Sequence, residues 1–552
     1  MRGRLDPDPR RDRLHLGARR SPLLPARAGR SGDARRRDRA ARGDRRRGAG
    51  RRVTEQTVLL GIAAHAQARP GAVAIVAGDR RVTYAELDAR ANRAAHAFAR
   101  RGVVDGDRVA VALRNRPEFL EAAAGAARLG AQVIPLSWRY KRAEVEAIVA
   151  DAGARLVVAE DDARDTMRGL PALRLGGDYE RELDNQSPDP VTDGIAPVFY
   201  RYYTSGTTGV PKAVERPSPD VGTYLNAMVG YPLLAGLTGP DEVHLVCGPL
   251  YHTAPCAFAN YALLLGHTVV LMEHFDAAES LMLIERERVT WTHMVPINFV
   301  RILALTDAER KRHDLSAVKR VMHAAAPCPP DVKRRIMDFF PSSTVWEYYG
   351  MTEGLATIIS PEEWLQKPGS VGRTAPNLTV SILDDRGNEL PPGEVGVIYV
   401  SPMGGVKFSY AGSPDKTAEA WRGDRFTVGD MGYLDADGYL FLTDRRQDMI
   451  ISGGANIYPA EVEAALYRHP AVGDCSVIGI PDDEWGEAVL AVVEPRAAVT
   501  EDELIAFCRD NLAHFKCPRR IAFVDALPRD PNGKVRKREL RDRYWAGRER
   551  KI

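Results

Sequence analysis

The stretch Tyr203–Val214 reads YTSGTTGVPKAV. Small hydroxyl residues alternate in it with glycines, and a lysine follows: Thr204, Ser205, Gly206, Thr207, Thr208, Gly209 and Lys212. Glycines let backbone N–H groups approach an anion closely, hydroxyls add donors, and a lysine adds a point charge. The stretch therefore predicts a loop that holds a polyphosphate, rather than a flexible surface linker, which rarely ends in Pro-Lys. It differs from a Walker A loop because Val210 and Pro211 separate Gly209 from Lys212.

Charge divides the chain into two parts. The first 52 of the 552 residues carry nineteen arginines and six aspartates, with no lysine or glutamate, which gives a charge of +13. The whole chain carries +3, so the other 500 residues carry −10. This mildly acidic body argues against a nucleic-acid-binding protein. Hydrophobic residues make up 44% of the chain, which is ample for large cores.

Residues 1–52 show almost no hydrophobic periodicity, and we expect them to be disordered. Three interpretations stay open: a basic arm that contacts nucleic acid or anionic lipid, a transit peptide, or read-through of GC-rich sequence upstream of a later start near Val53. The six aspartates argue against a transit peptide. We favour the third interpretation, in which this Arg-rich extension is not part of the native protein.

Cysteine usage and hydropathy predict a reduced, cytoplasmic compartment and no membrane span. The six cysteines form no CxxC pair: Cys247, Cys256, Cys328, Cys475, Cys508 and Cys517. No stretch approaches about 18 uninterrupted apolar residues. The N-terminus has charge but lacks the apolar core of a secretory signal.

Strands and helices alternate after Val58. Thr83 with Glu86 forms a capping-box pattern ahead of a helix that should end at Gly102. The next expected elements are a strand at 108–113, a helix at 118–129, a strand at 132–136, a helix at 143–149 and a strand at 155–159. This alternation predicts a parallel sheet covered by helices. Residues 179–195 are polar and rich in Pro and Asp, and we expect a loop there.

The pattern changes twice further along the chain. Short strands are expected at 243–247, within 263–272, and at 290–295, 318–323 and 344–348. From residue 378 onward, strands at 378–383, 395–400, 426–430 and 439–443 between Gly, Pro and Asp turns predict a compact antiparallel unit. The last hundred residues predict a small α+β domain, with helices at 459–469, 501–512 and 537–545 and strands at 471–480, 487–494 and 521–524.

Five motifs follow one another in a set order: Tyr203–Val214, Tyr349–Glu353, Val428–Asp430, Asp444–Gly454 and Pro531–Lys534. Together they resemble the adenylate-forming (AMP-binding) superfamily of acyl-CoA synthetases, adenylation domains and firefly-type luciferases. The resemblance covers about residues 55–545. It implies an α/β fold with a large N-terminal domain, 53–444, of parallel helix-covered sheets plus a small β-rich subdomain. A hinge at 445–448 would lead to a small, mobile α+β C-terminal domain, 449–552.

The resemblance also implies a two-step reaction with ATP, Mg²⁺ and coenzyme A. A carboxylate attacks the α-phosphate, pyrophosphate leaves and an acyl-adenylate forms; a thiol then takes the acyl group and releases AMP. Because ATP carries about four negative charges, fixed cations and Mg²⁺ must be in place before attack.

Site residues carry over by position in the motifs. Lys534 would bridge the incoming carboxylate and the α-phosphate, Glu353 would bind Mg²⁺, and Thr352 would contact the α-phosphate. The ring of Tyr349, next to Gly350, would stack on adenine. Asp430 would accept hydrogen bonds from both ribose hydroxyls, and Arg445 would make a second ribose or phosphate contact. The backbone that would line the adenine consists of Ala324, Ala325, Ala326 and Pro327.

The acyl pocket is expected around residues 252–261, 294–301 and 322–326. His252 matches an aromatic position near the acyl carbonyl, although a lone histidine is more often structural. Side chains in these stretches predict an apolar pocket without an evident charged anchor: Cys256, Phe258, Tyr261, Met294, Pro296, Phe299, Met322 and Ala324. Medium to long fatty acids are the first choice of substrate, as in lipid metabolism, and aryl acids are the second.

Rotation of the small domain between the two steps is implied as well. Ser452, Gly453 and Gly454 would then replace Lys534 at the active site and leave room for the pantetheine arm. The chain departs from the family pattern at Gln447, where Asp or Lys is usual. Ala455 also replaces a common Glu, and Ala213 a common Gly.

Two functions stay open after these comparisons of motifs. The first is an acid–CoA ligase; the alternative is a stand-alone adenylating enzyme that loads an acyl carrier protein. An amino-acid-activating domain would keep an Asp near Tyr251–Thr253, which is absent. A non-catalytic binder would be expected to lack Lys534, Glu353 or Asp430. The oligomeric state, monomer or homodimer, stays open.

Overall fold

The computed structural model describes residues 59–546, except residues 164, 193, 205–211, 218–221, 223–235, 238, 531 and 532. These residues belong to one compact unit. Predictions about residues 1–52 and about Ser205, Gly206, Thr207, Thr208 and Gly209 lie outside the described residues. Thr204 and Lys212 are described only as strand backbone.

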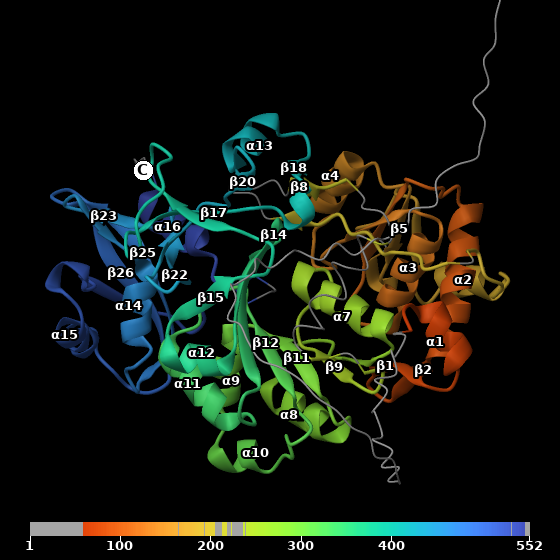
Figure 1. Cartoon of the computed structure of the whole chain (residues 1–552), viewed down its shortest axis with the longest axis horizontal. Helices are drawn as coiled ribbons and strands as arrows, with labels where there is room; N and C mark the ends of the chain where they lie inside the picture. The colour runs from red at the N-terminus through yellow and green to blue at the C-terminus, as the bar shows by residue number, and fades with distance from the viewer. Residues whose placement is uncertain are drawn as a thin grey trace, which may run out of the picture. The chain divides into compact units, whose positions relative to one another are not determined.

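A four-stranded parallel sheet forms the first layer, in the order β4-β3-β5-β6. Figure 1 shows its strand β5 among the helices of this part of the chain. Its strands are β3 (Arg108–Ala112), β4 (Gln132–Pro135), β5 (Leu156–Ala159) and β6 (Ala172–Arg174). The helices along it are α2 (Tyr84–Arg100), α3 (Pro117–Arg128) and α4 (Arg142–Ala152). The predicted capping box is present, because the Thr83 side chain accepts from the Glu86 N–H and the Glu86 carboxylate accepts from the Thr83 N–H at 2.8 Å. The predicted alternation up to residue 159 is therefore confirmed.

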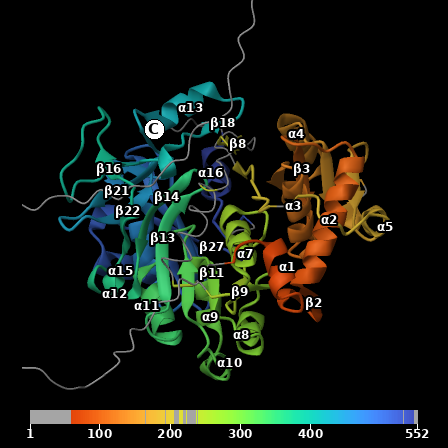
Figure 2. The same cartoon turned by 45° about the vertical axis from the view of Figure 1, so that its right-hand side comes forward.

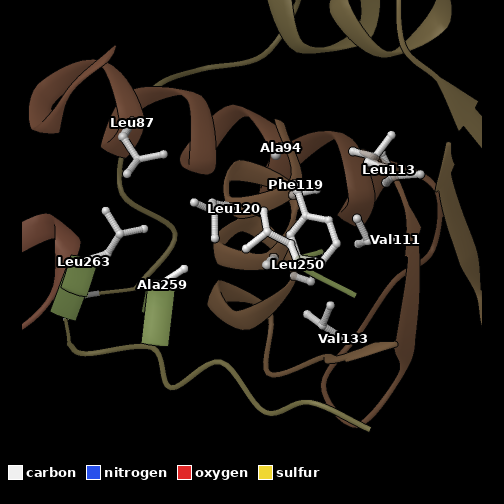
Figure 3. Packing of buried hydrophobic residues seen from close by; sticks show 14 of the residues in the cluster. Leu87, Ala94, Val111, Leu113, Phe119, Leu120, Val133, Leu250, Ala259 and Leu263 are labelled. Carbon is white, nitrogen blue, oxygen red and sulfur yellow. The ribbon is translucent and has the colours of Figure 1, made fainter. Parts of the chain in front are cut away.

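Helices α2 and α3 pack closely at Gly125. A Cβ at this position would lie 2.7 Å from the Cβ of Ala94, so only glycine permits this approach. The core around this contact also takes in the sheet and helix α7 (Thr253–Leu265). Figure 3 shows side chains of this cluster from several elements: Leu87, Ala94, Val111, Phe119, Leu120, Val133, Leu250, Ala259 and Leu263.

A fifteen-stranded sheet forms the largest layer, in the order β19-β20-β17-β21-β22-β15-β14-β13-β12-β11-β9-β10-β1-β2, with β16 beside β17. One half is parallel, apart from the edge strand β2: β1 (Val73–Ala77), β2 (Arg80–Thr83), β9 (Val243–Val246), β10 (Thr268–Leu271), β11 (Trp291–Met294), β12 (Arg320–His323) and β13 (Val345–Met351). The other half is antiparallel: β14 (Gly354–Ile359), β15 (Ser370–Thr374), β16 (Val380–Leu383), β17 (Gly396–Val400), β19 (Trp421–Arg422), β20 (Arg425–Phe426), β21 (Asp430–Leu434) and β22 (Tyr439–Arg445). In both views, α7 lies between α3 and strands β9 and β11 (Figures 1 and 2).

Several further helices complete this large domain: α1 (Ile62–Ala68), α5 (Asp178–Asp184), α8 (Ala277–Arg286), α9 (Pro296–Ala304), α10 (Asp307–Lys311), α11 (Pro330–Phe339), α12 (Pro361–Gln366) and α13 (Pro414–Ala420). A small three-stranded sheet has the order β18-β8-β7, and its strands β7 and β8 lie directly before and after the glycine-rich stretch in the sequence. It consists of β7 (Tyr203–Thr204), β8 (Lys212–Glu215) and β18 (Ser409–Tyr410).

The last hundred residues form the predicted α+β domain. Its five-stranded sheet has the order β24-β23-β26-β25, with β27 parallel to β26. Its elements are β23 (Ile450–Ser452), β24 (Ala455–Ile457), α14 (Pro459–Leu466), β25 (Val472–Asp482), β26 (Gly486–Pro495), α15 (Glu501–Asn511), β27 (Arg520–Phe523) and α16 (Lys537–Trp545). A core of its own lies between the sheet and helices α14 and α15.

Two predictions about the fold are wrong. Residues 179–195 are not all loop, because Tyr179 and Leu183 recur at helical spacing and bury one face of α5. The strand predicted at 426–430 is two strands, β20 and β21, because Gly429 takes a φ of 84° between them. The strands after residue 378 pair antiparallel as predicted, and β13 and β14 join them to the parallel half of the large sheet.

Candidate active site

A cavity of about 3570 Å³ opens at the carboxyl ends of strands β11, β12 and β13. Ligands of parallel sheets bind at this edge. Its volume exceeds the roughly 300–1,000 Å³ of an ordinary small-molecule pocket, so it can take more than one substrate at a time. Residues of the large domain and of the small domain both line it, among them Tyr349, Asp430 and Lys534.

The predicted adenine segment, Ala324–Pro327, follows β12 directly and lines the cavity. Ala325 has a φ of 77°. A side chain in this left-handed region costs roughly 1–2 kcal/mol. Backbone strain of this kind gathers at ligand sites, where the surrounding structure holds it in place. The segment therefore has a fixed, unusual backbone at the place where the sequence predicts a nucleotide base.

The carboxylate that is predicted to bind the ribose is held from two sides. Asp430, the first residue of β21, accepts the hydroxyl proton of Tyr349 on Oδ2 at 2.6 Å. Its other oxygen lies 3.2 Å from Nε of Arg445. Burial and the Asp430 carboxylate raise the pKa of Tyr349 well above its usual range, so this tyrosine stays a proton donor. The two contacts fix the plane of a carboxylate that faces the cavity.

The predicted phosphate residues lie in the turn between β13 and β14. Oε1 of Glu353 accepts the hydroxyl proton of Tyr410 at 2.7 Å. Oγ1 of Thr352 lies 3.3 Å from Oγ1 of Thr253. Oε2 of Glu353 has no hydrogen bond among the described residues, which leaves it available to a cation. No group of three or more His, Cys, Asp or Glu suited to a metal occurs in the described part of the chain. Since Mg²⁺ usually takes one or two carboxylates and completes its shell with substrate phosphates and water, Glu353 alone fits a Mg²⁺–ATP complex.

Lys534 enters the cavity from a closed turn of the small domain. Its N–H donates to Oδ1 of Asp530 at 2.9 Å, and the Asp530 N–H donates to the Lys534 carbonyl at 2.8 Å. Gly533 has a φ of 83°, and a Cβ there would lie 2.6 Å from Cγ2 of Ile297 on α9. Glycine is thus required both for the turn and for its contact with the large domain.

The charges around Lys534 come from both domains. Burial lowers the pKa of its ammonium group, and the charge of Arg445 lowers it further. The carboxylates of Asp530, Asp430 and Glu353 oppose this shift. The structure therefore brings Lys534 together with three of the predicted nucleotide and metal residues, Arg445, Asp430 and Glu353.

His252 precedes helix α7 and lines the same cavity. Burial, with a smaller contribution from Lys534, lowers the pKa of His252 to about 4, so the ring is neutral near pH 7. Its Nε2 is buried without a hydrogen-bond partner among the described residues. A neutral ring with a spare nitrogen can accept or donate one hydrogen bond to a substrate, but it supplies no charge.

Aromatic side chains dominate the cavity wall beside α7. The ring of Phe258 lies 5.7 Å from that of Tyr261 and 6.1 Å from that of Tyr348, centroid to centroid. Tyr200 and Tyr202 stack at 5.5 Å. The polar atoms among these rings are uncharged: Asn260 donates to the Tyr200 hydroxyl at 2.6 Å, and the Tyr348 hydroxyl lies 3.0 Å from Nε2 of His293.

The composition of the predicted acyl pocket needs correction. Phe258, Tyr261, Pro296 and Ala324 line the cavity as expected. Cys256, Met294, Phe299 and Met322 do not; they are buried in the cores behind the wall. Strand and helix periodicity turns these side chains away, which a list of sequence ranges does not reveal.

The cavity residues that the sequence analysis missed include Tyr200, Tyr202, Arg216 and Tyr410. Nη2 of Arg216 donates to the main-chain oxygen of Thr352 at 2.6 Å. The two-residue period of strand β8 could have pointed to Arg216, which follows Lys212 by four positions. No local signal links Tyr410 to Glu353, which lies 57 residues earlier.

A family model described as AMP-binding enzyme matches residues 62–407, and one for the C-terminal domain of AMP-binding enzymes matches residues 461–534. The chain belongs to the AMP-binding enzymes. Feruloyl-CoA synthase of Amycolatopsis sp is 37% identical over 487 residues, which cover 87% of this chain and 97% of that protein. Fatty acid–[acyl-carrier-protein] ligase ScoC of Streptomyces coeruleorubidus is 32% identical over 518 residues, which cover 90% and 98%.

The solved structure of ATP-bound MatB from Rhodopseudomonas palustris superimposes with a TM-score of 0.77 at 29% identity, and covers 88% of this chain and 99% of that chain. These comparisons confirm the adenylate-forming resemblance, the fold class, and the interpretation of the chain as an acid–CoA ligase. Both a CoA-linked and a carrier-protein-linked enzyme occur among the relatives.

The hinge expected in an AMP-binding enzyme lies between two anchored residues. Arg446 is held to the large domain, because its N–H donates to the Gly429 carbonyl at 2.9 Å and its side chain lies 3.1 Å from Asp385. Asp448 is held to the small domain by an ion pair with Arg541 of α16. Gln447 stands between them. This arrangement is consistent with a pivot at 445–448, which stays a prediction.

Ser452, Gly453 and Gly454 are not brought to the cavity. They form the end of β23 and the turn to β24, where a Cβ on Gly453 would lie 2.4 Å from the ring of Trp485.

Among the residues that the structure describes, no helix combines the length and the apolar character needed to cross a bilayer.

Proposed function

We propose that this acid–CoA ligase activates an aryl carboxylic acid as its acyl-adenylate and transfers the acyl group to coenzyme A. The observation that supports the proposal is the position of Lys534. Its ammonium group shares the cavity with Arg445, Asp430 and Glu353, and the same cavity continues into a wall of aromatic rings. An amine placed between a nucleotide site and an aromatic pocket suits the joining of an acid to AMP.

Each residue has a role in the first step. A carboxylate oxygen of the acid attacks the α-phosphorus, and pyrophosphate leaves with the electrons of the broken P–O bond. Lys534 holds the carboxylate against the α-phosphate, and Lys212 with the glycine-rich loop binds the other phosphates. Asp430 accepts from the ribose hydroxyls, while Thr352 contacts the α-phosphate. Glu353 would hold Mg²⁺, which neutralises charge on the phosphates.

The cavity wall supports the proposed class of acid. Stacked rings such as Tyr200 and Tyr202 favour a flat substrate, since offset and edge-to-face contacts reward another ring. The uncharged amide of Asn260 and the hydroxyl of Tyr348, which both line the cavity, suit neutral ring substituents such as hydroxyl or methoxy groups. The name of one relative, feruloyl-CoA synthase, agrees with this choice. We therefore rank aryl acids above the fatty acids that the sequence favoured first.

A second acceptor stays a candidate. The name of ScoC specifies an acyl carrier protein, which presents the same thiol arm as coenzyme A. In the second step the thiol sulfur attacks the acyl carbonyl, the thiol proton is released, and AMP leaves. We propose that rotation at Gln447 brings Ser452, Gly453 and Gly454 to the cavity for this step.

Reaction in the cytoplasm is part of the proposal, and the six unpaired cysteines support it.

Pyrophosphate release tests the proposal. The enzyme is incubated with ATP and Mg²⁺ and a panel of cinnamic, hydroxycinnamic, benzoic and fatty acids, with and without CoA. We expect release with hydroxycinnamic acids, together with acyl-CoA when CoA is present. Faster turnover of fatty acids would overturn the aryl assignment. Acyl-adenylate without acyl-CoA would assign the acceptor role to a carrier protein.

A further inference from the structure

Arg216 is a cation of the cavity wall that the roles above do not use. It follows strand β8 directly and is exposed to the cavity. One of its five N–H groups donates to the Thr352 carbonyl at 2.6 Å. Arg216 makes no other hydrogen bond or ion pair among the described residues, so the rest of its planar donor fork is available to a ligand.

The surroundings of Arg216 place it at the phosphate end of the site. Glu353, the expected Mg²⁺ ligand, acts on the guanidinium electrostatically. Tyr410, which donates to Glu353, lies on β18, and β18 pairs with β8 through Tyr410 and Val214. Lys212, the lysine expected to bind phosphate, begins the same strand β8. Strand β8 thus carries the expected phosphate lysine at one end and Arg216 just beyond the other.

We propose that Arg216 binds the β- and γ-phosphates of ATP, the part that leaves as pyrophosphate. This inference rests on the proposed function, since it adds a residue to the same site. An arginine fork matches two phosphate oxygens at once, which a lysine cannot do. Its bond to the Thr352 carbonyl holds the fork next to the residue expected at the α-phosphate. Positive charge there stabilises the pyrophosphate as the P–O bond breaks.

The acid is the other ligand that could meet this guanidinium. Tyr202, in the aromatic wall, also acts on Arg216 electrostatically. The direct contact favours the phosphates, because the hydrogen bond of Arg216 is to Thr352 and not to a residue of the aromatic wall. A test must therefore separate binding of ATP from binding of the acid.

Affinities for ATP and AMP, measured by calorimetry in the presence of Mg²⁺ and without any acid, make this separation. AMP has only the α-phosphate, whereas ATP has all three. We expect Arg216→Gln to weaken ATP binding about tenfold or more and to leave AMP binding within about twofold of wild type. Arg216→Lys keeps the charge but loses the planar donor fork, so its ATP affinity should lie between those of wild type and Arg216→Gln. Arg216→Met serves if Arg216→Gln does not fold.

Lys407→Gln is the matched control. Lys407 also lines the cavity, but its ammonium group donates to the Gly423 carbonyl at 2.7 Å and lies over the ring of Trp421. ATP and AMP affinities of this variant should equal those of wild type. The titrations need no acid, so they remain a valid test even if the enzyme activates no acid in the panel. Failure to activate any acid would instead count against the proposed function.

Three results would overturn the inference. ATP affinity within about twofold of wild type in Arg216→Gln would mean that the fork does not contact the phosphates. Equal weakening of ATP and AMP would mean that Arg216 only holds the turn at Thr352. An increased KM for the acid with unchanged ATP affinity would assign Arg216 to the acid pocket.

Discussion

Tyr349 donates its hydroxyl proton to Asp430 across 2.6 Å and so links two strands that are far apart in the sequence. Tyr349 lies on β13, the last strand of the parallel half of the large sheet, and Asp430 begins β21 in the antiparallel half. Arg445 contacts the other oxygen of the same carboxylate. The carboxylate expected to bind the ribose is therefore oriented by groups from both halves of the sheet.

Removing the Tyr349 hydroxyl should weaken nucleotide binding. In Tyr349→Phe the ring is kept, but Asp430 loses a charge-assisted hydrogen bond of about 1.5–3 kcal/mol and can turn away from the ribose. We expect AMP affinity, measured by calorimetry, to fall about tenfold. Tyr399→Phe, on strand β17 and outside the cavity wall, is the control and should bind AMP as wild type does. Unchanged AMP affinity in Tyr349→Phe would show that the bond does not position Asp430.

Short motifs, through their resemblance to a known family, predicted residues that do line this cavity, and the roles of those residues stay predictions. Tyr349, Thr352 and Glu353 follow one another at the end of a strand, and Lys534 follows a glycine in a turn, so their neighbours in sequence define their setting. The strand–helix alternation likewise predicted the parallel sheets, because each element shows its own period.

Contacts between distant segments could not be predicted in this way. The bond from Tyr410 to Glu353 and the packing of Gly533 against Ile297 depend on how separate elements meet. Helix α5 was missed because only Tyr179 and Leu183 mark its buried face within a polar stretch. The single sheet of fifteen strands was missed because pairing partners are not adjacent in sequence.

The protonation of Lys534 should set the alkaline limit of the first step. Burial and Arg445 lower its pKa from the usual 10.5, whereas Asp530 raises it. The charged amine is the form that binds anions, so activity should fall as the pH rises through this pKa. The alkaline limb of the pH–rate profile should therefore lie below pH 10.5. Asp530→Asn removes a negative charge yet keeps an oxygen for the Lys534 N–H. We expect it to move the alkaline limb of the pH profile of kcat/KM for ATP to lower pH.

The measurement is pyrophosphate exchange between about pH 7 and 10. Asp525→Asn changes an exposed carboxylate of the same small domain and should leave the limb in place. A limb that moves upward in Asp530→Asn would contradict the assigned role of Lys534, because loss of a nearby negative charge cannot favour a protonated amine.

Backbone strain at Ala325 should appear in the stability of variants. A β-branched side chain tolerates a φ of 77° poorly, so Ala325→Val should lower the free energy of unfolding by about 2 kcal/mol or more. In Ala325→Gly, the loss of backbone strain stabilises the native state by about 1–2 kcal/mol. The greater freedom of the unfolded chain costs about 0.5–1 kcal/mol, so the free energy of unfolding should rise slightly. Urea denaturation measures both. Ala326→Val, at the next position with ordinary φ, is the control, and an equal loss there would rule out strain as the cause.

Acid should destabilise the protein through His267, a buried ring whose Nδ1 accepts from Nε1 of Trp291 at 3.3 Å. Burial lowers the pKa of His267 to about 3, with smaller contributions from the charges of His65 and Arg69. Since the unfolded chain binds a proton below about 6.5, stability from this group is complete above that pH and is lost as the pH falls toward the folded pKa.

The expected slope from this one histidine is about 1.4 kcal/mol per pH unit. His267→Gln lacks the titrating ring, so its free energy of unfolding should fall less steeply than that of wild type between about pH 6 and 4. The absolute stability of the variant is lower, because Trp291 loses its acceptor, and only the slope bears on the argument. His274→Gln, at an exposed position, should keep the slope of wild type. Parallel curves for wild type and His267→Gln would mean that the ring is not held neutral in the native state.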